Sequence, residues 1–274
     1  MPRAGKARGL PGTQAFMIDN RAPVICRAGL GLPLLLLAAL LGGCVATHPD
    51  FTGLWQNADP AKIIRPDVNA TEADYTAEAW ASIQDYVKNW NITVEDPANF
   101  CVKYGMPNTM SSRARTYVMD IYQTPKRITV IHEYMDNYRI IHFDTNKVPD
   151  GVTPSNNGYS VAHWEGNTLV IDTTALKARP TVERMQRSEL AHITERWNRH
   201  VDPEFGQVLE VDMTVEDPKV FRHPVRAFEM LKQAEAGAQL NEYACPDTLW
   251  DDHLSKVLAE RAQARAAVAT PPAH

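Results

Sequence analysis

The feature that most constrains this chain is the stretch Gly158–Thr174, which reads GYSVAHWEGNTLVIDTT. Two runs rich in β-branched and aromatic residues flank the dipeptide Gly166-Asn167. A two-residue Gly-Asn loop between such runs predicts a β-hairpin. The loop also sets the register, because Glu165 must then face Thr168 and the pairing continues outward one residue at a time.

This register predicts two different faces for the hairpin, because residues paired across two strands share a face. One face is apolar and is expected to face the core: Trp164, Leu169, Ala162 and Ile171. The other face carries His163, Glu165 and Asp172. That second face is either exposed to solvent or forms a polar site under a covering element.

Other segments alternate with the same period and predict further strands. They are Arg115–Gln123, Arg127–Met135, Tyr138–Asp144, Leu209–Glu216, Arg222–Lys232 and Leu240–Cys245. The Asp136-Asn137 loop predicts a second hairpin in which His132 faces Ile141. The segment Arg187–His200 fits both a helix and a strand. About nine strands joined mostly by short turns predict a mainly β fold, an antiparallel meander closed as a lipocalin-like barrel or strongly curved sheet. A single covered sheet is the alternative.

Two segments predict helices. Thr71–Trp90 starts with a possible cap, Thr71, followed three residues later by Asp74, and its apolar residues then recur at helical spacing. The Ala- and charge-rich segment Asp251–Val268 predicts a C-terminal helix, followed by a frayed tail.

The N-terminus predicts export. Basic residues precede the apolar run Leu32–Leu41, which is shorter than the roughly 20 residues that a spanning helix needs. Leu41-Gly42-Gly43-Cys44 resembles a bacterial lipobox, which implies cleavage before Cys44 and attachment of acyl chains such as palmitate. Val45 after the cysteine resembles lipoproteins sorted to the outer membrane and facing the periplasm. Met17 is an alternative start.

The chain therefore divides into four predicted parts. Residues 1–43 form a lipoprotein signal peptide, and 44–50 form an anchor linker. Residues 51–246 form the β-barrel-like domain, with a helix near 71–91. Residues 247–274 form the C-terminal helix and tail.

Charge and cysteine usage narrow the partners. Residues 1–43 hold five of the 28 basic and one of the 33 acidic residues, which leaves the remainder with a formal charge of −9. An acidic domain is a poor partner for nucleic acid, whose phosphates select Lys and Arg. Of the four cysteines, Cys26 lies in the predicted signal peptide and Cys44 is the predicted lipidation site. The other two, Cys101 and Cys245, predict a disulfide in an oxidising compartment. No metal pattern is recognised among the histidines and cysteines, and no cofactor is predicted.

Several motifs together resemble a bacterial family of exported proteins and lipoproteins. They are DFTGLW at 50–55, Glu133-Tyr134 followed by Arg139, WEGNTLVIDT at 164–173, and Glu242-Tyr243-x-Cys245. The likeness covers residues 51–246 and implies a fold and a compartment, with no established activity. Gly53-x-Trp55 and the strand number also resemble lipocalin-like (calycin) barrels, where the Trp plugs one end.

Two groups of residues are candidates for a site. A polar cavity or acid–base site would draw on Glu133, Arg139, His163, Glu165, Asp172, His192 and Glu195. The alternative is structural ion pairs, for example Glu133 or Glu195 with Arg139 or Arg196, and a solvated outer face for His163, Glu165 and Asp172. An apolar ligand would be lined by Trp55, Trp80, Trp90 and Trp164, although tryptophans at such spacing also serve packing.

Three functions follow as hypotheses. The first is a membrane-anchored protein that holds a small apolar or amphipathic molecule in its barrel. The second is a cofactor-free isomerase, lyase or hydrolase on the same scaffold. The third is a structural component of an envelope complex. A filled barrel favours the third, an open apolar cavity the first, and convergent Glu, His and Arg the second. The oligomeric state is left open.

Overall fold

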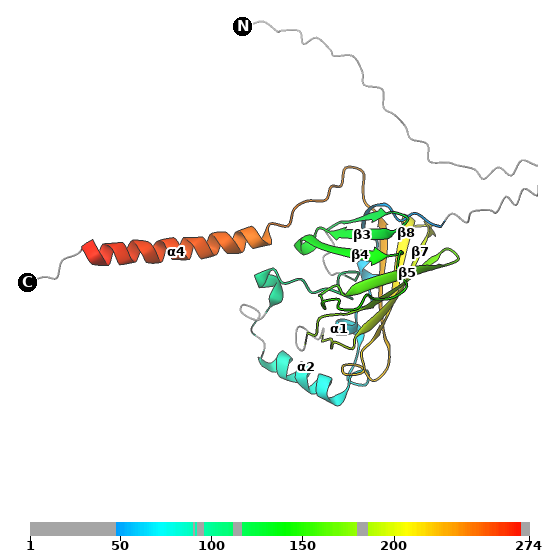
Figure 1. Ribbon diagram of the computed structural model, residues 1–274, viewed down its shortest axis with the longest axis horizontal. Helices are drawn as coiled ribbons and strands as arrows, with labels where there is room; N and C mark the ends of the chain where they lie inside the picture. Colours follow the sequence, from blue (N-terminus) through cyan, green and yellow to red (C-terminus); the bar gives the residue numbers. More distant parts are fainter. Residues whose placement is uncertain (1–47, 90, 92–95, 112–116, 180–185, 270–274) are drawn as a thin grey trace, which may run out of the picture. The chain divides into compact units, whose positions relative to one another are not determined.

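The computed structural model describes residues 48–89, 91, 96–111, 117–179 and 186–269. The predicted signal peptide and Cys44 lie outside the described residues, as does Trp90. The described part confirms a mainly β fold with a closed barrel, an inserted helix and a C-terminal helix (Figure 1). The strands are β1 Gly53–Asn57, β2 Met119–Gln123, β3 Arg127–His132, β4 Asn137–His142, β5 Tyr159–Glu165, β6 Thr168–Thr174, β7 His192–Asp202, β8 Gly206–Glu216 and β9 Val225–Gln233.

The strand order follows the chain, and β1 pairs with β9 to close the barrel. All neighbouring pairs are antiparallel except β4 and β5, which run parallel. Strand directions in a closed ring of nine cannot alternate throughout, so at least one parallel pair is required. The long connection from His142 to Tyr159 provides it, because parallel neighbours need a crossover rather than a tight turn.

The β5–β6 hairpin confirms the predicted register. Glu165 faces Thr168, Trp164 faces Leu169 and Ala162 faces Ile171. Gly166 has φ +62°, the left-handed conformation that a two-residue loop of this kind demands and that glycine adopts readily.

The β3–β4 register differs from the prediction. His132 faces Asn137 rather than Ile141, a shift of four residues. The 3₁₀ turn η3, Tyr134–Asp136, occupies residues that were expected to extend the strand. Met135 and Asp136 have positive φ there, which ends the strand before the expected loop. Because the shift is even, the predicted faces of both strands are preserved.

Three other element predictions are resolved or corrected. The ambiguous segment after Arg187 forms a strand, β7. The inserted helix α2 spans Ala77–Asn89, because Thr76 Oγ1 accepts from Ala79 N at 3.2 Å while Thr71 instead binds Asp74 in a preceding turn. Leu240–Cys245 is not a strand. Cys245 begins the helix α4, Cys245–Ala269.

Short helices complete the described elements: η1 Pro60–Lys62, α1 Pro66–Asn69 and η2 Pro97–Phe100. Among the described residues, no helix combines the length and hydrophobicity that a membrane span requires.

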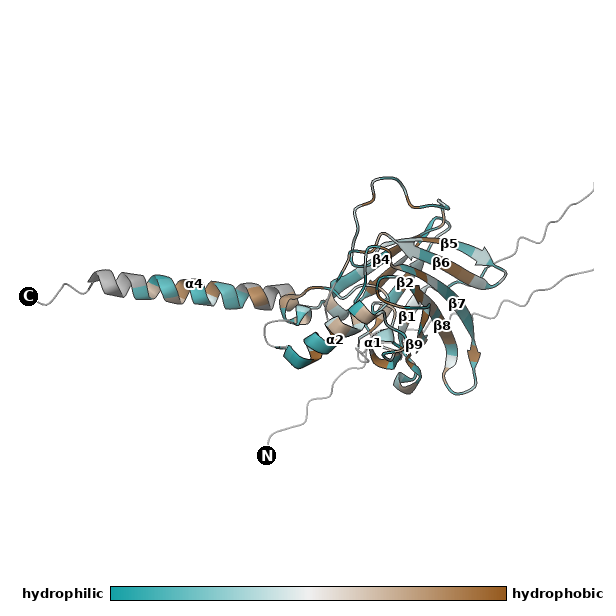
Figure 2. Cartoon of the chain, turned by 90° about the horizontal axis from the view of Figure 1, so that it is seen from below, coloured by the Kyte–Doolittle hydropathy of each residue, from teal (hydrophilic) through white to brown (hydrophobic). Residues whose placement is uncertain are grey.

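Inward-facing side chains fill the barrel. Alternate residues of each strand point inward, and the alternation of polar and apolar residues can be followed along β8 in Figure 2. Trp55 and Trp197 are fully buried, and Trp55 Nε1 donates to Phe51 O at 2.9 Å. The described interior is therefore a packed core and not a wide open cavity.

One end of the barrel is closed by residues 105–111, which we call the closing segment. It lies at the end where β3 and β8 finish and β7 begins. Met106 and Met110 are fully buried there. Gly105 has φ +77°, and a Cβ on it would lie 2.0 Å from Asn156 O, so only glycine fits. Thr109 Oγ1 accepts from Asn137 Nδ2 at 3.0 Å, which fixes the segment to β4.

Candidate functional site

The structure divides the seven polar candidates into three groups and does not bring them into one cavity. Arg139 and Glu195 meet inside the barrel. Glu133 lies at the barrel end, where its carboxylate accepts from Val118 N and Asn241 Nδ2, both at 3.1 Å. The outer surface carries His163, Glu165, Asp172 and His192.

Arg139 and Glu195 form a buried, bidentate ion pair. Their side chains are 1% and 0% exposed, and both terminal guanidinium nitrogens of Arg139 donate to the carboxylate of Glu195. Arg139 also donates to hydroxyls of the next two strands: Nε and Nη2 donate to Ser160 Oγ at 3.1 and 2.9 Å, and Nη2 donates to Thr173 Oγ1 at 2.8 Å. Glu195 Oε2 accepts a further hydrogen bond from Trp197 Nε1 at 3.0 Å. Such complete pairing is what a buried charge needs to be tolerated. The geometry is that of a structural ion pair.

His132 is the remaining ionisable group next to this network. Burial, and then the positive charge of Arg139, lowers the pKa of His132 to about 3. The imidazole is therefore neutral at physiological pH. An unfolded histidine keeps a pKa near 6.5, so the unfolded state takes up the proton first. Acidification below pH 6.5 consequently costs folding stability through this residue.

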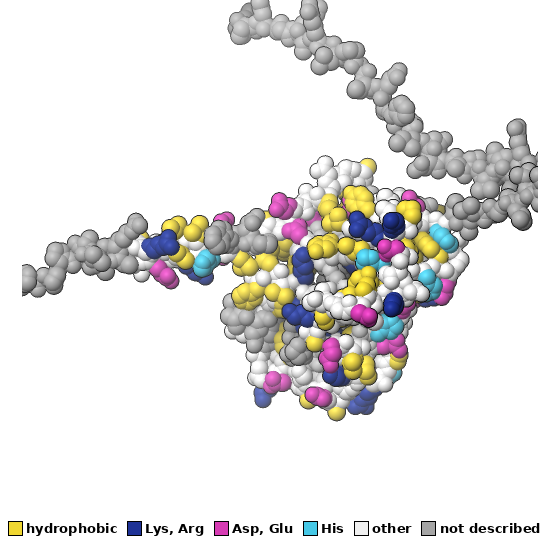
Figure 3. Space-filling view, viewed as in Figure 1, with side chains coloured by type: hydrophobic (Ala, Val, Ile, Leu, Met, Phe, Trp, Pro, Cys, Tyr) yellow, Lys and Arg dark blue, Asp and Glu magenta, His cyan; other side chains and the backbone are white. Residues whose placement is uncertain are grey.

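The four outer candidates lie on β5, β6 and β7 and make exposed polar contacts. His163 Nε2 lies 3.4 Å from Glu165, which also accepts from Arg196 at 2.9 Å, and these side chains are about half exposed. His192 lies between two carboxylates, 3.1 Å from Asp172 and 3.3 Å from Glu216. Figure 3 shows histidines beside acidic side chains along one edge of the surface. Among the described residues, no group of His, Cys, Asp and Glu is arranged to hold a metal ion.

The tryptophan candidates do not line a common cavity. Trp55 is in the core, and Trp80 on α2 packs against Tyr75 with ring centroids 5.8 Å apart. Trp164 lies at the barrel end opposite the closing segment and stacks on His48, with ring centroids 4.4 Å apart. Of these three, only Trp55 lines one of the pockets described below.

The first pocket, which we call the apolar pocket, lies beside the closing segment. It encloses about 480 Å³ of space, its open mouth included. Its lining is mostly apolar: Pro66, Tyr104, Met106, Pro107, Ala191, Ile193, Val215 and Phe221, with Asn108, Gln186, Arg187 and Asp217 as the polar members.

Arg187 places a buried cation in the wall of the apolar pocket. Its donors reach backbone oxygens of Tyr104, Met106 and Lys177 at 2.7–2.9 Å, and Asn156 Oδ1 at 3.2 Å. Among the described residues no carboxylate forms an ion pair with it. Burial, and then the neighbouring charge of Arg179, lowers the pKa of Arg187 to about 10.

The second pocket, which we call the polar pocket, lies at the same barrel end and touches Thr109 of the closing segment. It encloses about 360 Å³, its mouth included. Its walls are Trp55, Gln56, Asn57, Thr109, Tyr117, Val118, Met119, His132, Tyr134, Glu229 and Leu231.

Sequence reasoning missed most residues of both pockets. Asn57, His132 and Ile193 occupy ordinary inward positions of alternating strands, and nothing local distinguishes them from core residues. The closing segment was not among the predicted strands and helices. The polar residues at inward positions were a weak signal of a site, because a polar side chain is found in the core less often than an apolar one.

Comparisons with known proteins assign no family. No protein-family model matches the chain, and no curated protein matches it. Among solved structures, a "secretary abundant heat soluble (SAHS)" protein from Ramazzottius varieornatus is similar, with 11% sequence identity. The match covers 69% of this chain and 98% of that chain, with a TM-score of 0.26. A similarity this low carries no conclusion about function.

Proposed function

We propose that this chain is a lipid-anchored protein of the bacterial envelope, held at the outer membrane and facing the periplasm, which binds a small apolar or amphipathic molecule. The packed barrel interior agrees with the structural alternative, and the observation that carries the binding proposal is instead the apolar pocket at the closed end of the barrel. Buried apolar walls favour burial of an apolar body, at about 25 cal/mol per Å² removed from water.

The wall of the pocket also favours a ligand with one polar end. Arg187 is only 7% exposed and is coordinated by neutral oxygens. An acceptor or anionic group of a ligand would find a desolvated cation on this wall, where electrostatic attraction is stronger than in water. An amphipathic molecule uses both parts of the lining.

Export is supported by two independent features. The lipobox-like Leu41-Gly42-Gly43-Cys44 supports lipid anchoring. The disulfide between Cys101 and Cys245 supports an oxidising compartment, because disulfides rarely persist in the cytosol. The motif resemblance to exported bacterial proteins agrees with both and remains part of the proposal.

Replacing Cys44 with serine is expected to abolish lipidation. When the full chain is expressed in a Gram-negative host fed an alkyne-labelled palmitate, the native protein should take up label and fractionate with the outer membrane. The Cys44→Ser variant should be unlabelled and should keep its uncleaved signal, because lipoprotein signal peptidase acts only after the cysteine is modified. Cys26→Ser is the matched control, and equal labelling of all three proteins would refute the anchor.

Narrowing the apolar pocket is expected to weaken ligand binding. Ala191 lies in the pocket wall and is 3% exposed. Ala191→Leu adds volume there and should reduce the affinity of the full, detergent-purified protein for 1-aminoanthracene about tenfold. Fluorescence titration measures this affinity.

The control substitutes another buried alanine outside the apolar pocket. Ala162 on β5 is 8% exposed, and Ala162→Leu should overpack the core to a similar extent while leaving the affinity unchanged. No saturable binding by the native protein would contradict the carrier proposal and favour a structural role. Conversion of a retained molecule to a new mass would favour an enzyme.

A further inference from the structure

The polar pocket contains two buried polar atoms whose hydrogen-bonding capacity is unused. His132 Nε2 and Asn57 Oδ1 both line it, and neither has a hydrogen-bond partner among the described residues. His132 is 7% exposed. A buried polar atom without a partner is unfavourable, and native proteins contain few of them. Two such atoms in one pocket therefore point to a group that binds there.

The geometry fixes the role of Asn57. Its Nδ2 donates to Glu229 Oε1 at 3.0 Å, and a carboxylate can only accept, so the amide orientation is determined. Oδ1 is therefore the atom that faces the pocket without a donor. His132 in β3 pairs with Met119 in β2, which also lines the pocket, and Met119 pairs with Trp55 in β1, two residues before Asn57.

The charges around the pocket disfavour an ionic ligand. The carboxylate of Glu229, 4% exposed, lines the wall and repels an anion. The positive charge of Arg139, which acts on His132, repels a cation. His132 itself is neutral. A neutral group that both donates and accepts satisfies the two atoms together: it donates to Asn57 Oδ1 and accepts from His132 Nε2–H.

The rest of the lining selects the body of the ligand. Trp55, Tyr117 and Tyr134 contribute aromatic rings, and the Tyr117 and Tyr134 ring centroids are 5.3 Å apart. Met119 and Leu231 supply further apolar surface, and thioether–aromatic contacts are favourable. Aromatic walls favour a planar aromatic body packed in offset or edge contact.

We propose that the polar pocket is a second binding site, separate from the apolar pocket, which takes an uncharged aromatic alcohol with its hydroxyl between His132 and Asn57. The hydroxyl is the smallest neutral group with both a donor and an acceptor. In this complex His132 carries its proton on Nε2.

The test compares 4-methylphenol with its ether, 4-methylanisole, which has nearly the same shape and lacks the donor. Calorimetric titration of the full, detergent-purified protein should show 4-methylphenol binding about tenfold more tightly. His132→Phe and Asn57→Leu should each remove this preference. His132→Phe should also unfold at a higher urea concentration than the native protein without ligand, because it removes an unsatisfied buried atom. Asn57→Leu is compared by affinity alone, because it also takes the Nδ2 donor from the buried carboxylate of Glu229.

Three controls locate the binding in the polar pocket. His163→Gln, on the exposed outer surface, should keep the preference. Ala191→Leu, which narrows the apolar pocket, should also keep it, so failure here is distinguishable from failure of the first proposal. Nitrogen NMR of the histidine side chains should show His132 as the Nε2–H form when 4-methylphenol is bound.

Several outcomes would overturn the proposal. Equal affinities for phenol and ether, or no saturable binding of either, would show that the pocket does not recognise a hydroxyl. A preference that survives in both His132→Phe and Asn57→Leu would place binding elsewhere. Loss of stability in His132→Phe would show that this imidazole holds the fold together and is not kept for a ligand.

Discussion

The variant Arg139→Met is expected to lower the free energy of unfolding by about 3–5 kcal/mol. The substitution removes the only ion-pair partner that the described residues provide for Glu195, whose side chain is 0% exposed. A buried carboxylate without a partner is costly whether it stays charged or takes up a proton. Urea unfolding at pH 7, followed by tryptophan fluorescence, measures the loss.

A double variant separates the cost of the lone charge from the value of the pair. Arg139→Met with Glu195→Leu removes both charges and should recover much of the stability, because replacing a whole buried pair by apolar side chains is often neutral or stabilising. Recovery will be partial, since Ser160, Thr173 and Trp197 lose hydrogen-bond partners. A double variant as unstable as Arg139→Met would contradict this account.

An exposed ion pair provides the control for charge removal as such. Arg226 donates to Asp212 at 2.8 and 3.1 Å, in the same bidentate manner, but its side chain is 53% exposed. Arg226→Met should change stability by less than about 1 kcal/mol, because water screens the pair. The contrast between two bidentate pairs isolates the effect of burial.

Local signals predicted the parts of the fold that depend on local interactions. The β5–β6 register follows from the Gly166-Asn167 loop and the period-two pattern, and both are confirmed. The same reasoning was wrong for β3–β4, because the Asp136-Asn137 dipeptide lies where η3 forms. A loop dipeptide sets the register only when the flanking residues continue the strands up to it.

A closed barrel was one of the predicted architectures, whereas the parallel contact was not predicted. The number and pattern of strands favoured a meander closed as a barrel or strongly curved, with a single covered sheet as the alternative. The parallel pairing of β4 with β5 depends on how far residues 143–158 carry the chain, and sequence pattern does not reveal this. An odd strand number does require at least one such pair once closure is assumed.

The interior network lay beyond sequence reasoning for a different reason. Its members come from β4, β5, β6 and β7, and each is a single polar residue in an otherwise apolar pattern. The Arg139–Glu195 pairing had been one of several structural ion pairs considered. Which carboxylate meets which arginine depends on the three-dimensional arrangement of strands 56 residues apart in sequence.

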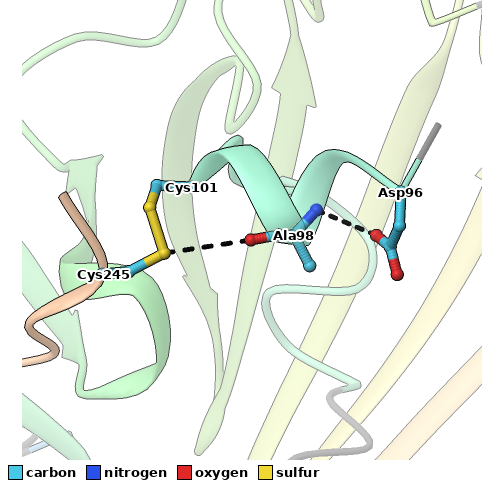
Figure 4. The surroundings of a disulfide bond; sticks show 4 residues. All are labelled: Asp96, Ala98, Cys101 and Cys245. Carbon is cyan, nitrogen blue, oxygen red and sulfur yellow. Dashed lines mark hydrogen bonds between the residues drawn. A yellow bond between two sulfur atoms is a disulfide. The ribbon is translucent and has the colours of Figure 1, made fainter. Parts of the chain in front are cut away.

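The second large effect concerns the predicted disulfide, which the structure confirms between Cys101 and Cys245. Their Cα atoms are 5.9 Å apart, and the bond ties η2 to the first residue of α4 (Figure 4). The cross-link spans a sequence separation of 144 residues, which includes β2 to β9. Replacing both cysteines with serine should lower the free energy of unfolding by about 2–4 kcal/mol, because the unfolded chain regains conformational freedom.

A local effect should accompany the global one. The segment before Cys245 is also held by Tyr243 N, which donates to Asp136 Oδ1 at 2.9 Å, and by Asn241 Nδ2, which donates to Glu133 Oε1 at 3.1 Å. Without the disulfide, limited proteolysis should cut residues 234–244 faster, at urea concentrations where the barrel is still folded. Dithiothreitol should produce the same two changes in the native protein and none in the double serine variant. Equal unfolding midpoints for native and variant proteins, with unchanged proteolysis, would show that this bond neither restrains the unfolded chain nor holds the C-terminal segment.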